Sequence, residues 1–154
     1  MFVMTTKVNK KKIAMILGAV VALIVLLVIV LGSRQSVSTG ANMTISSNDD
    51  RVRFLASFGW EVVTSPAETS QVRIPAESSP VFTRYNSLQK TMGYDLTPYA
   101  GKTVMRYVYT IKNFPGATEP VYATVLICDN KIIGGDITDT AATGKIQGFS
   151  MQKE

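Results

Sequence analysis

The sequence contains 154 residues, of which 46% are hydrophobic and 18% are charged, with a formal net charge of +5. A chain of this length forms one ordinary domain and little more. Because the sequence contains no histidine, Ser-His-Asp and Cys-His catalysis, histidine-ligated zinc and an imidazole pH switch are excluded.

The excess positive charge lies at the N-terminus. Residues 1–34 contain Lys7, Lys10, Lys11, Lys12 and Arg34 and no acidic residue, and the other 11 basic residues are balanced by 11 acidic residues. Proteins that bind nucleic acid carry a basic face. We therefore expect no nucleic-acid binding from residues 35–154.

A membrane-spanning helix is predicted for residues 13–32. The segment reads IAMILGAVVALIVLLVIVLG, twenty residues without a charge, and a helix of that length spans roughly 30 Å, the thickness of a bilayer's hydrocarbon core. Lysines precede the segment, which predicts a cytoplasmic basic tail at residues 1–12 and an extracytoplasmic domain on the plasma membrane. The alternative is a cleaved signal and a secreted domain, but signal peptides have apolar regions of only about 7–15 residues.

Three small residues within this segment, Ala14, Gly18 and Ala22, are spaced four apart. Such a stripe would allow two helices to approach closely and predicts a weak homodimer. The alternative is that glycine and alanine are simply common in membrane helices.

Residues 33–48 read SRQSVSTGANMTISSN and show no apolar periodicity. This composition predicts a flexible linker that lifts the domain at residues 49–154 off the membrane. We interpret the glycosylation sequon at Asn42 as a chance match in a polar segment.

The first part of the domain is predicted to contain one helix and two strands. A cap at residues 47–50 begins the helix and Gly59 ends it. Strands are expected at Trp60–Val63 and Gln71–Ile74, and Pro75 closes the second of them.

A second helix is predicted between Ser79, which can cap it before Pro80, and Gly93. Its apolar residues, Val81, Tyr85, Leu88 and Met92, fall on one continuous stripe. We expect Tyr85 to pack this helix against the sheet, together with Tyr107.

Three long strands follow, at residues 102–112, 121–128 and 131–138, and the last two are joined by a tight turn at Asp129-Asn130. A short edge strand is expected near residues 145–149. The predicted fold class is α+β: a transmembrane helix, then a small domain of helices against an antiparallel sheet in the order α-β-β-α-β-β-β.

Several motifs resemble those of a bacterial family, domain of unknown function 4830, found mostly in clostridial and related Gram-positive organisms. They are Phe54-Leu55-x-x-Phe58-Gly59-Trp60-Glu61-Val62, Val72-x-Ile74-Pro75, Tyr85-Asn86-x-Leu88-Gln89-Lys90, Gly93-Tyr94-Asp95-Leu96, Tyr99-x-Gly101-Lys102 and Ile132-Ile133-Gly134-Gly135-Asp136-Ile137. The resemblance covers residues 49–149 and implies a membrane-anchored domain without an established activity. Near its C-terminus the family often has a histidine, where this chain has Ile146-Gln147-Gly148-Phe149.

No motif for chemistry stands out. Gly134-Gly135-Asp136 lacks the Lys-Ser/Thr of a phosphate loop and is interpreted as a bulge or a close backbone approach. The spacing of Asp129, Asp136 and Asp139 does not match a calcium loop. Cys128 is the only cysteine and is expected to be a buried thiol rather than an intermolecular bridge. We expect no metal, no cofactor and no enzymatic activity.

The remaining candidates are aromatic and polar residues that could form an interaction surface for a peptide, a glycan or a partner domain in the cell envelope. They are Trp60, Tyr94, Tyr99, Arg106, Tyr109 and Asn113. The sequence therefore favours a membrane-anchored, non-catalytic binding module. The alternatives are a cell-envelope hydrolase that uses paired carboxylates and a regulatory anchor whose cytoplasmic tail contacts a soluble partner.

Overall fold

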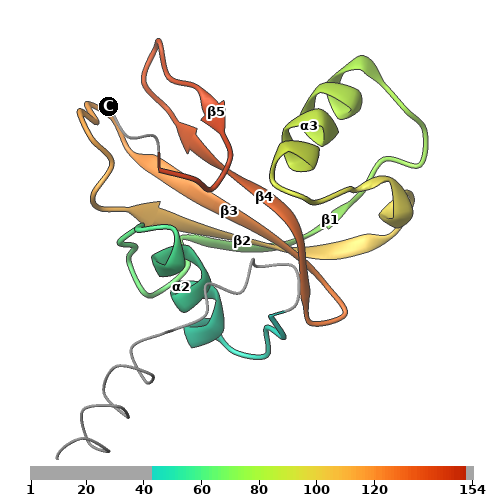
Figure 1. Cartoon of the computed structure of the whole chain (residues 1–154), viewed down its shortest axis with the longest axis horizontal. Coiled ribbons are helices and arrows are strands. Elements are labelled where there is room, and N and C mark those ends of the chain that lie inside the picture. The colour runs from blue at the N-terminus through green and yellow to red at the C-terminus, as the bar shows by residue number, and fades with distance from the viewer. Residues whose placement is uncertain (1–42, 152–154) are drawn as a thin grey trace, which may run out of the picture. The chain divides into compact units, whose positions relative to one another are not determined.

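A five-stranded antiparallel sheet in the order β1-β2-β3-β4-β5 forms the centre of the domain in the computed structural model (Figure 1). The model describes residues 43–151, so the predicted membrane segment, the cytoplasmic tail, the small-residue stripe and the sequon asparagine lie outside the described residues. Within residues 43–151, no helix is long and apolar enough to cross a membrane. The chain divides into two units, residues 1–36 and residues 37–154, and all described residues belong to the second unit.

The elements are α2 (Asn48–Ser57), β1 (Glu68–Arg73), α3 (Pro80–Thr91), a short 3-10 turn (Thr97–Tyr99), β2 (Thr103–Ile111), β3 (Val121–Cys128), β4 (Lys131–Asp139) and β5 (Ile146–Gln147). The α+β class is confirmed, but the order is α-β-α-β-β-β-β, with one strand between the helices and four after them. Figure 1 shows α2 and α3 on opposite faces of the sheet.

The helix α2 begins where the sequence predicts it. The Ser47 hydroxyl accepts a hydrogen bond from the Asp50 amide, and the Asp50 carboxylate accepts one from the Ser47 amide, which completes a capping box. Gly59 follows the helix with a φ of +92°, a conformation that glycine adopts at little cost.

The domain includes residues from the predicted linker. Ile45 is 2% exposed, and its amide donates a 2.8 Å hydrogen bond to the Asn130 carbonyl in the β3–β4 turn. The sequence placed Ile45 in the linker because a single isoleucine in a polar segment forms no periodic apolar pattern that would indicate burial.

The strand predicted at Trp60–Val63 does not form. Only Val62 pairs with a neighbour, as an isolated bridge to Ile111. Pro66 lies just beyond, and since proline has no N–H to donate, regular pairing with β2 begins only at Glu68. The second predicted strand therefore starts three residues earlier than expected, as β1.

The helix α3 has the predicted ends but buries a different face. The Ser79 hydroxyl accepts a hydrogen bond from the Phe82 amide, as expected of a cap. The buried residues are Asn86 and Gln89, whereas Val81, on the predicted apolar stripe, is 80% exposed. The inward-facing Asn86 forms hydrogen bonds with Asp95, Thr97 and the Leu96 amide. The Gln89 side-chain oxygen accepts from the Gly135 amide, although the buried Nε2 of Gln89 has no hydrogen-bond partner among the described residues. Part of the apolar stripe remains at the surface.

The strands β2 to β5 confirm the predicted meander. Asp129 and Asn130 have φ values of +49° and +58°, as a tight hairpin turn requires, and a bulge between Leu126 and Ile127 shifts the β3–β4 register. Tyr107 lies under Arg51 of α2, and Tyr85 reaches β4 from α3, so both tyrosines pack a helix on the sheet as expected.

Buried side chains fill both faces of the sheet unequally. The larger cluster lies on the α2 face and includes Phe54, Tyr109, Val125 and Phe149. The smaller cluster lies under α3 and contains five buried residues, Ile74, Leu96, Val104, Leu126 and Ile133. The α3 face of the sheet is therefore the less filled of the two.

Candidate functional site

A groove of about 390 Å³ lies between α3 and the sheet, and we call it the α3 groove. Its lining includes Val81 and Tyr85 of α3, Arg106 of β2, Asp136 of β4 and Ile146 of β5. Figure 1 shows α3 and β5 rising from the same face of the sheet, with β4 between them. The lining of the α3 groove thus includes residues from α3 and from all five strands.

The floor of the groove follows from the strand register. Thr124 of β3 pairs with both Val108 and Asp136, while Thr138 of β4 pairs with Ile146 of β5. Paired residues, and residues two apart on one strand, point to the same face of a sheet. The pairing therefore places Asp136, Thr138 and Ile146 together beneath α3.

Asp136 is the buried charge of this floor. It is 6% exposed, and its two carboxylate oxygens accept hydrogen bonds of 2.7 Å from the hydroxyls of Tyr85 and Thr138. Burial, followed by the Asp136 charge, raises the pKa of Tyr85 well above its usual range, although Arg106 opposes this shift. The phenol therefore stays protonated and donates to the carboxylate.

The other carboxylate near the groove is also paired. Nη1 of Arg106 lies 2.7 Å from Oε1 of Glu68, which also accepts a hydrogen bond from the Ser70 hydroxyl. Asp136 and Glu68 thus each have two donors. Both Asp136 oxygens accept hydrogen bonds, whereas both donors to Glu68 reach Oε1, and its Oε2 has no hydrogen-bond partner among the described residues.

The outer part of the groove is apolar. Val81 is 80% exposed and Ile146 is 57% exposed, and both line a second hollow of about 390 Å³ with Pro80, Arg84 and Leu88. Because Val81, Tyr85 and Ile146 line both hollows, the two adjoin each other. Arg84 has no ion pair or side-chain hydrogen bond with any residue of the described part of the chain.

The glycine pair of β4 fixes α3 above this floor. The buried Oε1 of Gln89 accepts a 2.8 Å hydrogen bond from the Gly135 amide, and a Cβ on Gly134 would lie 2.6 Å from the same oxygen. The close backbone approach expected at these glycines is confirmed, and the β3–β4 register shift lies beside them, between Leu126 and Ile127. Together with the Tyr85–Asp136 contact, this interaction sets the width of the groove.

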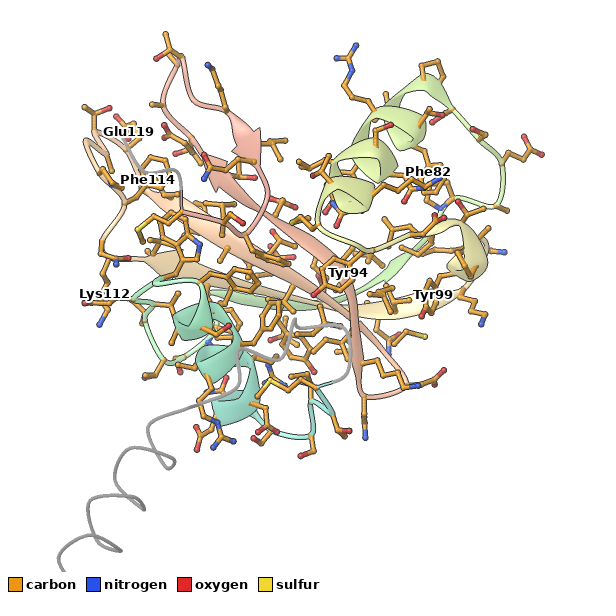
Figure 2. All side chains as sticks on the ribbon, in the orientation of Figure 1. Phe82, Tyr94, Tyr99, Lys112, Phe114 and Glu119 are labelled. Atoms are coloured by element: carbon orange, nitrogen blue, oxygen red, sulfur yellow. The ribbon has the colours of Figure 1, made fainter. Side chains whose placement is uncertain are left out.

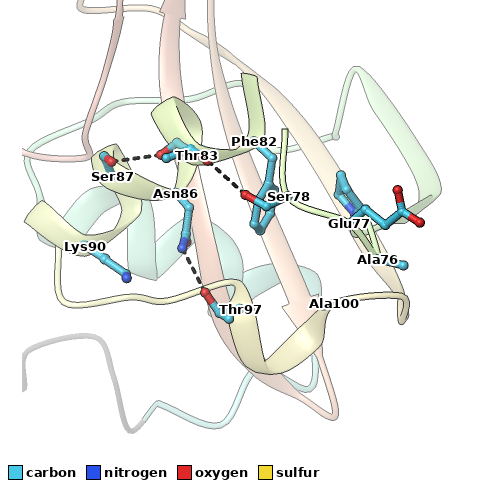
Figure 3. Close-up of a pocket in the computed structure, with 11 residues that line it drawn as sticks. Ala76, Glu77, Ser78, Phe82, Thr83, Asn86, Ser87, Lys90, Thr97 and Ala100 are labelled. Carbon is cyan, nitrogen blue, oxygen red and sulfur yellow. Dashed lines mark hydrogen bonds between the residues drawn. The ribbon is translucent and has the colours of Figure 1, made fainter. Parts of the chain in front are cut away.

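A smaller hollow of about 300 Å³ lies on the other side of α3 (Figure 3). Its polar side chains bond to one another or to nearby residues. The Asn86 amide donates to Thr97 and Asp95, the Ser78 and Thr83 hydroxyls are 3.1 Å apart, and Lys90 pairs with Asp95 at 3.5 Å. These contacts hold the loop after α3 in place, and we assign the hollow no further role.

The predicted interaction residues do not form one surface. Trp60, Tyr94 and Tyr109 are buried, and Trp60 donates its Nε1 hydrogen to the Phe149 carbonyl and stacks on Phe114. Figure 2 shows Phe114 and Tyr99 on opposite sides of the domain.

The polar members of that set also serve local structure. The Asn113 side chain bonds the Gly59 carbonyl and the Glu61 amide. Tyr99 is half-buried and lies under Lys102. Arg106 is the one predicted residue that the structure places in the α3 groove.

No group of three His, Cys, Asp or Glu residues that could hold a metal ion occurs between residues 43 and 151. Cys128 is half-buried rather than buried, beside the smaller apolar cluster. Burial, followed by the nearby charge of Asp129, raises the pKa of its thiol, which keeps it protonated. This environment does not activate a nucleophile.

The fold and the groove define a small α+β domain with an open, partly apolar cleft and no catalytic constellation among the described residues. The family domain of unknown function (DUF4830) matches residues 54–137, more than half of the chain, and the chain belongs to that family. No curated protein and no solved structure matches this chain. The matched region contains both contacts between α3 and β4, which explains the motifs around Tyr85 and Gly134 in structural terms.

Sequence reasoning missed Arg84, Asp136 and Ile146 as groove residues. Part of the signal was present, because Val81 and Tyr85 belong to the predicted stripe of α3. The apolar stripe could not show that Val81, one of its members, remains exposed to solvent in the folded domain.

Proposed function

We propose that this domain is a non-catalytic binding module and that a partner binds in the α3 groove. The observation that carries the proposal is the pair of exposed apolar walls, Val81 and Ile146, above a floor whose one carboxylate, Asp136, already accepts two hydrogen bonds. Binding sites are typically concave and apolar, with a few polar groups that fix orientation.

The alternative of a hydrolase with paired carboxylates receives no support from this geometry. Asp136 is the only carboxylate among the described residues that line the groove, and both of its oxygens accept hydrogen bonds, while Glu68, which pairs with Arg106, is not part of the lining. A general acid or base must reach its substrate with a free oxygen or proton. We therefore retain the binding module.

We further propose that residues 13–32 anchor the protein in the plasma membrane, with residues 1–12 in the cytoplasm and the groove outside. The apolar length and the preceding lysines support this arrangement. The function of the anchor would be placement, since it confines the binding module to the outer surface of the membrane.

A photoreactive amino acid at position 81 of the full chain tests the binding site. The matched control is position 63, because Val63 is also an exposed valine, 43% exposed, but lies outside the groove. In intact cells we expect a covalent adduct from position 81 and none from position 63. Equal adducts from both positions, or none from either, would contradict the proposal.

Replacing Lys10, Lys11 and Lys12 with glutamate tests the anchor. Loss of positive charge before the segment should weaken or invert insertion. External protease should digest the domain of the wild-type protein and spare that of an inverted variant. An unchanged topology would argue against the predicted orientation.

A further inference from the structure

The outer part of the α3 groove combines apolar walls with one uncompensated cation. We propose that its occupant is an acidic, apolar peptide segment of another protein, with an apolar side chain between Val81 and Ile146 and a carboxylate on Arg84. This inference rests on the proposed function and specifies the chemistry of the partner.

The first step is the charge that the groove leaves unused. Asp136 accepts hydrogen bonds from Tyr85 and Thr138, and Arg106 forms an ion pair with Glu68. The helix α3 contains Arg84 and Lys90 and no acidic residue. Lys90 pairs with Asp95, which leaves Arg84 as the cation available to a ligand at the groove.

The second step is the position of Arg84. It lines the same hollow as Val81, Leu88 and Ile146, so a cation and an apolar surface face one occupant. Arginine binds a carboxylate in a planar, bidentate geometry, which adds specificity to an apolar contact. The complementary ligand therefore carries a carboxylate next to a large apolar side chain.

The third step is the shape of the surface. Val81 and Ile146 are 80% and 57% exposed, and both line one hollow of about 390 Å³. A concave apolar site receives a side chain from its ligand. The shape therefore favours a peptide over a lipid surface.

Selection from a phage-displayed library of random 12-residue peptides tests the inference, with the full chain held in phosphatidylcholine nanodiscs. Arg84→Glu reverses the proposed contact. Lys112→Glu is the matched control, because this exposed lysine lies far from Phe82 of α3 in Figure 2 and makes the same change of charge. Thermal unfolding of each variant shows whether the fold is kept.

We expect the wild type and Lys112→Glu to enrich peptides with Asp or Glu beside Leu, Ile, Val or Phe. Arg84→Glu should bind these peptides at least about tenfold more weakly, as the loss of a charge-assisted hydrogen bond implies. The inference is overturned if no peptide is enriched, if the enriched peptides lack acidic residues, or if Arg84→Glu binds them equally well.

Two further measurements separate the other occupants. Binding to phosphatidylglycerol vesicles that is lost in Val81→Ser would overturn the inference in favour of a membrane surface. Self-association of the wild type that Arg84→Glu abolishes would overturn it in favour of a second copy. Adducts at position 81 without an acidic preference would refute the peptide chemistry and leave the proposed function standing.

Discussion

Replacing Tyr85 with phenylalanine removes one hydroxyl between α3 and β4 and leaves the ring in place. The lost interaction is the 2.7 Å hydrogen bond from the Tyr85 hydroxyl to Oδ2 of Asp136. Asp136 is 6% exposed and keeps only the Thr138 hydroxyl as a side-chain donor. The variant therefore leaves a buried carboxylate half-satisfied.

The expected loss of stability in Tyr85→Phe depends on the charge of the hydrogen-bond acceptor, the Asp136 carboxylate. A hydrogen bond to a charged group contributes about 1.5–3 kcal/mol, so we expect the free energy of unfolding to fall by that amount. In a domain of this size each kcal/mol lowers the unfolding midpoint by about 4 °C.

The same variant changes the response to high pH. The pKa of Tyr85 is raised in the folded state, first by burial and then by Asp136, so the unfolded chain loses this proton first as the pH rises above about 10. Stability then falls by about 1.4 kcal/mol per pH unit for each such tyrosine. Tyr85→Phe should therefore reduce the fall of stability with pH by the contribution of one tyrosine. The contributions of Tyr94 and Tyr109, whose pKa values burial also raises, should remain.

Urea unfolding of the full chain in a mild detergent measures both effects. Trp60 is the only tryptophan of the sequence and is buried against Phe114, so its fluorescence reports on the fold. Tyr122→Phe is the control, because this half-buried tyrosine has no side-chain hydrogen bond among the described residues. Equal stability of Tyr85→Phe and the wild type, or an unchanged alkaline slope, would refute the role of the Tyr85–Asp136 contact.

Three other changes test the structure by the same unfolding measurement. Gly135→Ala should cost more than about 3 kcal/mol, because a Cβ would overlap the Thr124 carbonyl and the Phe149 ring, whereas Gly116→Ala, with open space around it, should cost only about 1–2 kcal/mol. Phe149→Ala should cost about 3–5 kcal/mol, since this ring is fully buried although it lies beyond the residues that match the family. Hydrogen bonds, first from Ser47 and then from Ser46, hold the pKa of Asp50 well below its usual range, so stability should fall as the pH drops below about 4, and Asp50→Asn should reduce this dependence by the share of one carboxyl. The share of Asp95 should remain, because hydrogen bonds from Asn86 and Thr97 lower its pKa as well. A mild Gly135→Ala, a stable Phe149→Ala or an unchanged acid response in Asp50→Asn would contradict the respective argument.

The sequence alone predicted the features that depend on neighbouring residues. The caps at Ser47 and Ser79 and the turn at Asp129-Asn130 formed as expected. A cap or a tight turn is decided within about four residues, because its hydrogen bonds join atoms that are close along the chain. The strand segments at residues 102–112, 121–128 and 131–138 predicted the meander, because the tight turn at Asp129-Asn130 joins the last two directly along the chain.

Only the tertiary structure decided which face of α3 is buried. The apolar stripe predicted that Val81 would join a continuous face, but α3 is turned so that Gln89 meets Gly135 and Tyr85 meets Asp136, contacts that span 46 and 51 residues. Such contacts depend on which strands become neighbours, and no local pattern contains that information. The hydrogen bonds that Tyr85 and the Gln89 side-chain oxygen make to β4 outweigh one exposed valine, even though the buried Nε2 of Gln89 has no partner among the described residues. The reason is that burial of the Asp136 carboxylate without a donor would cost more than an apolar side chain left in water. The rotation of α3 leaves Val81 and Arg84 at the rim of the groove, so the candidate site is a product of the tertiary structure.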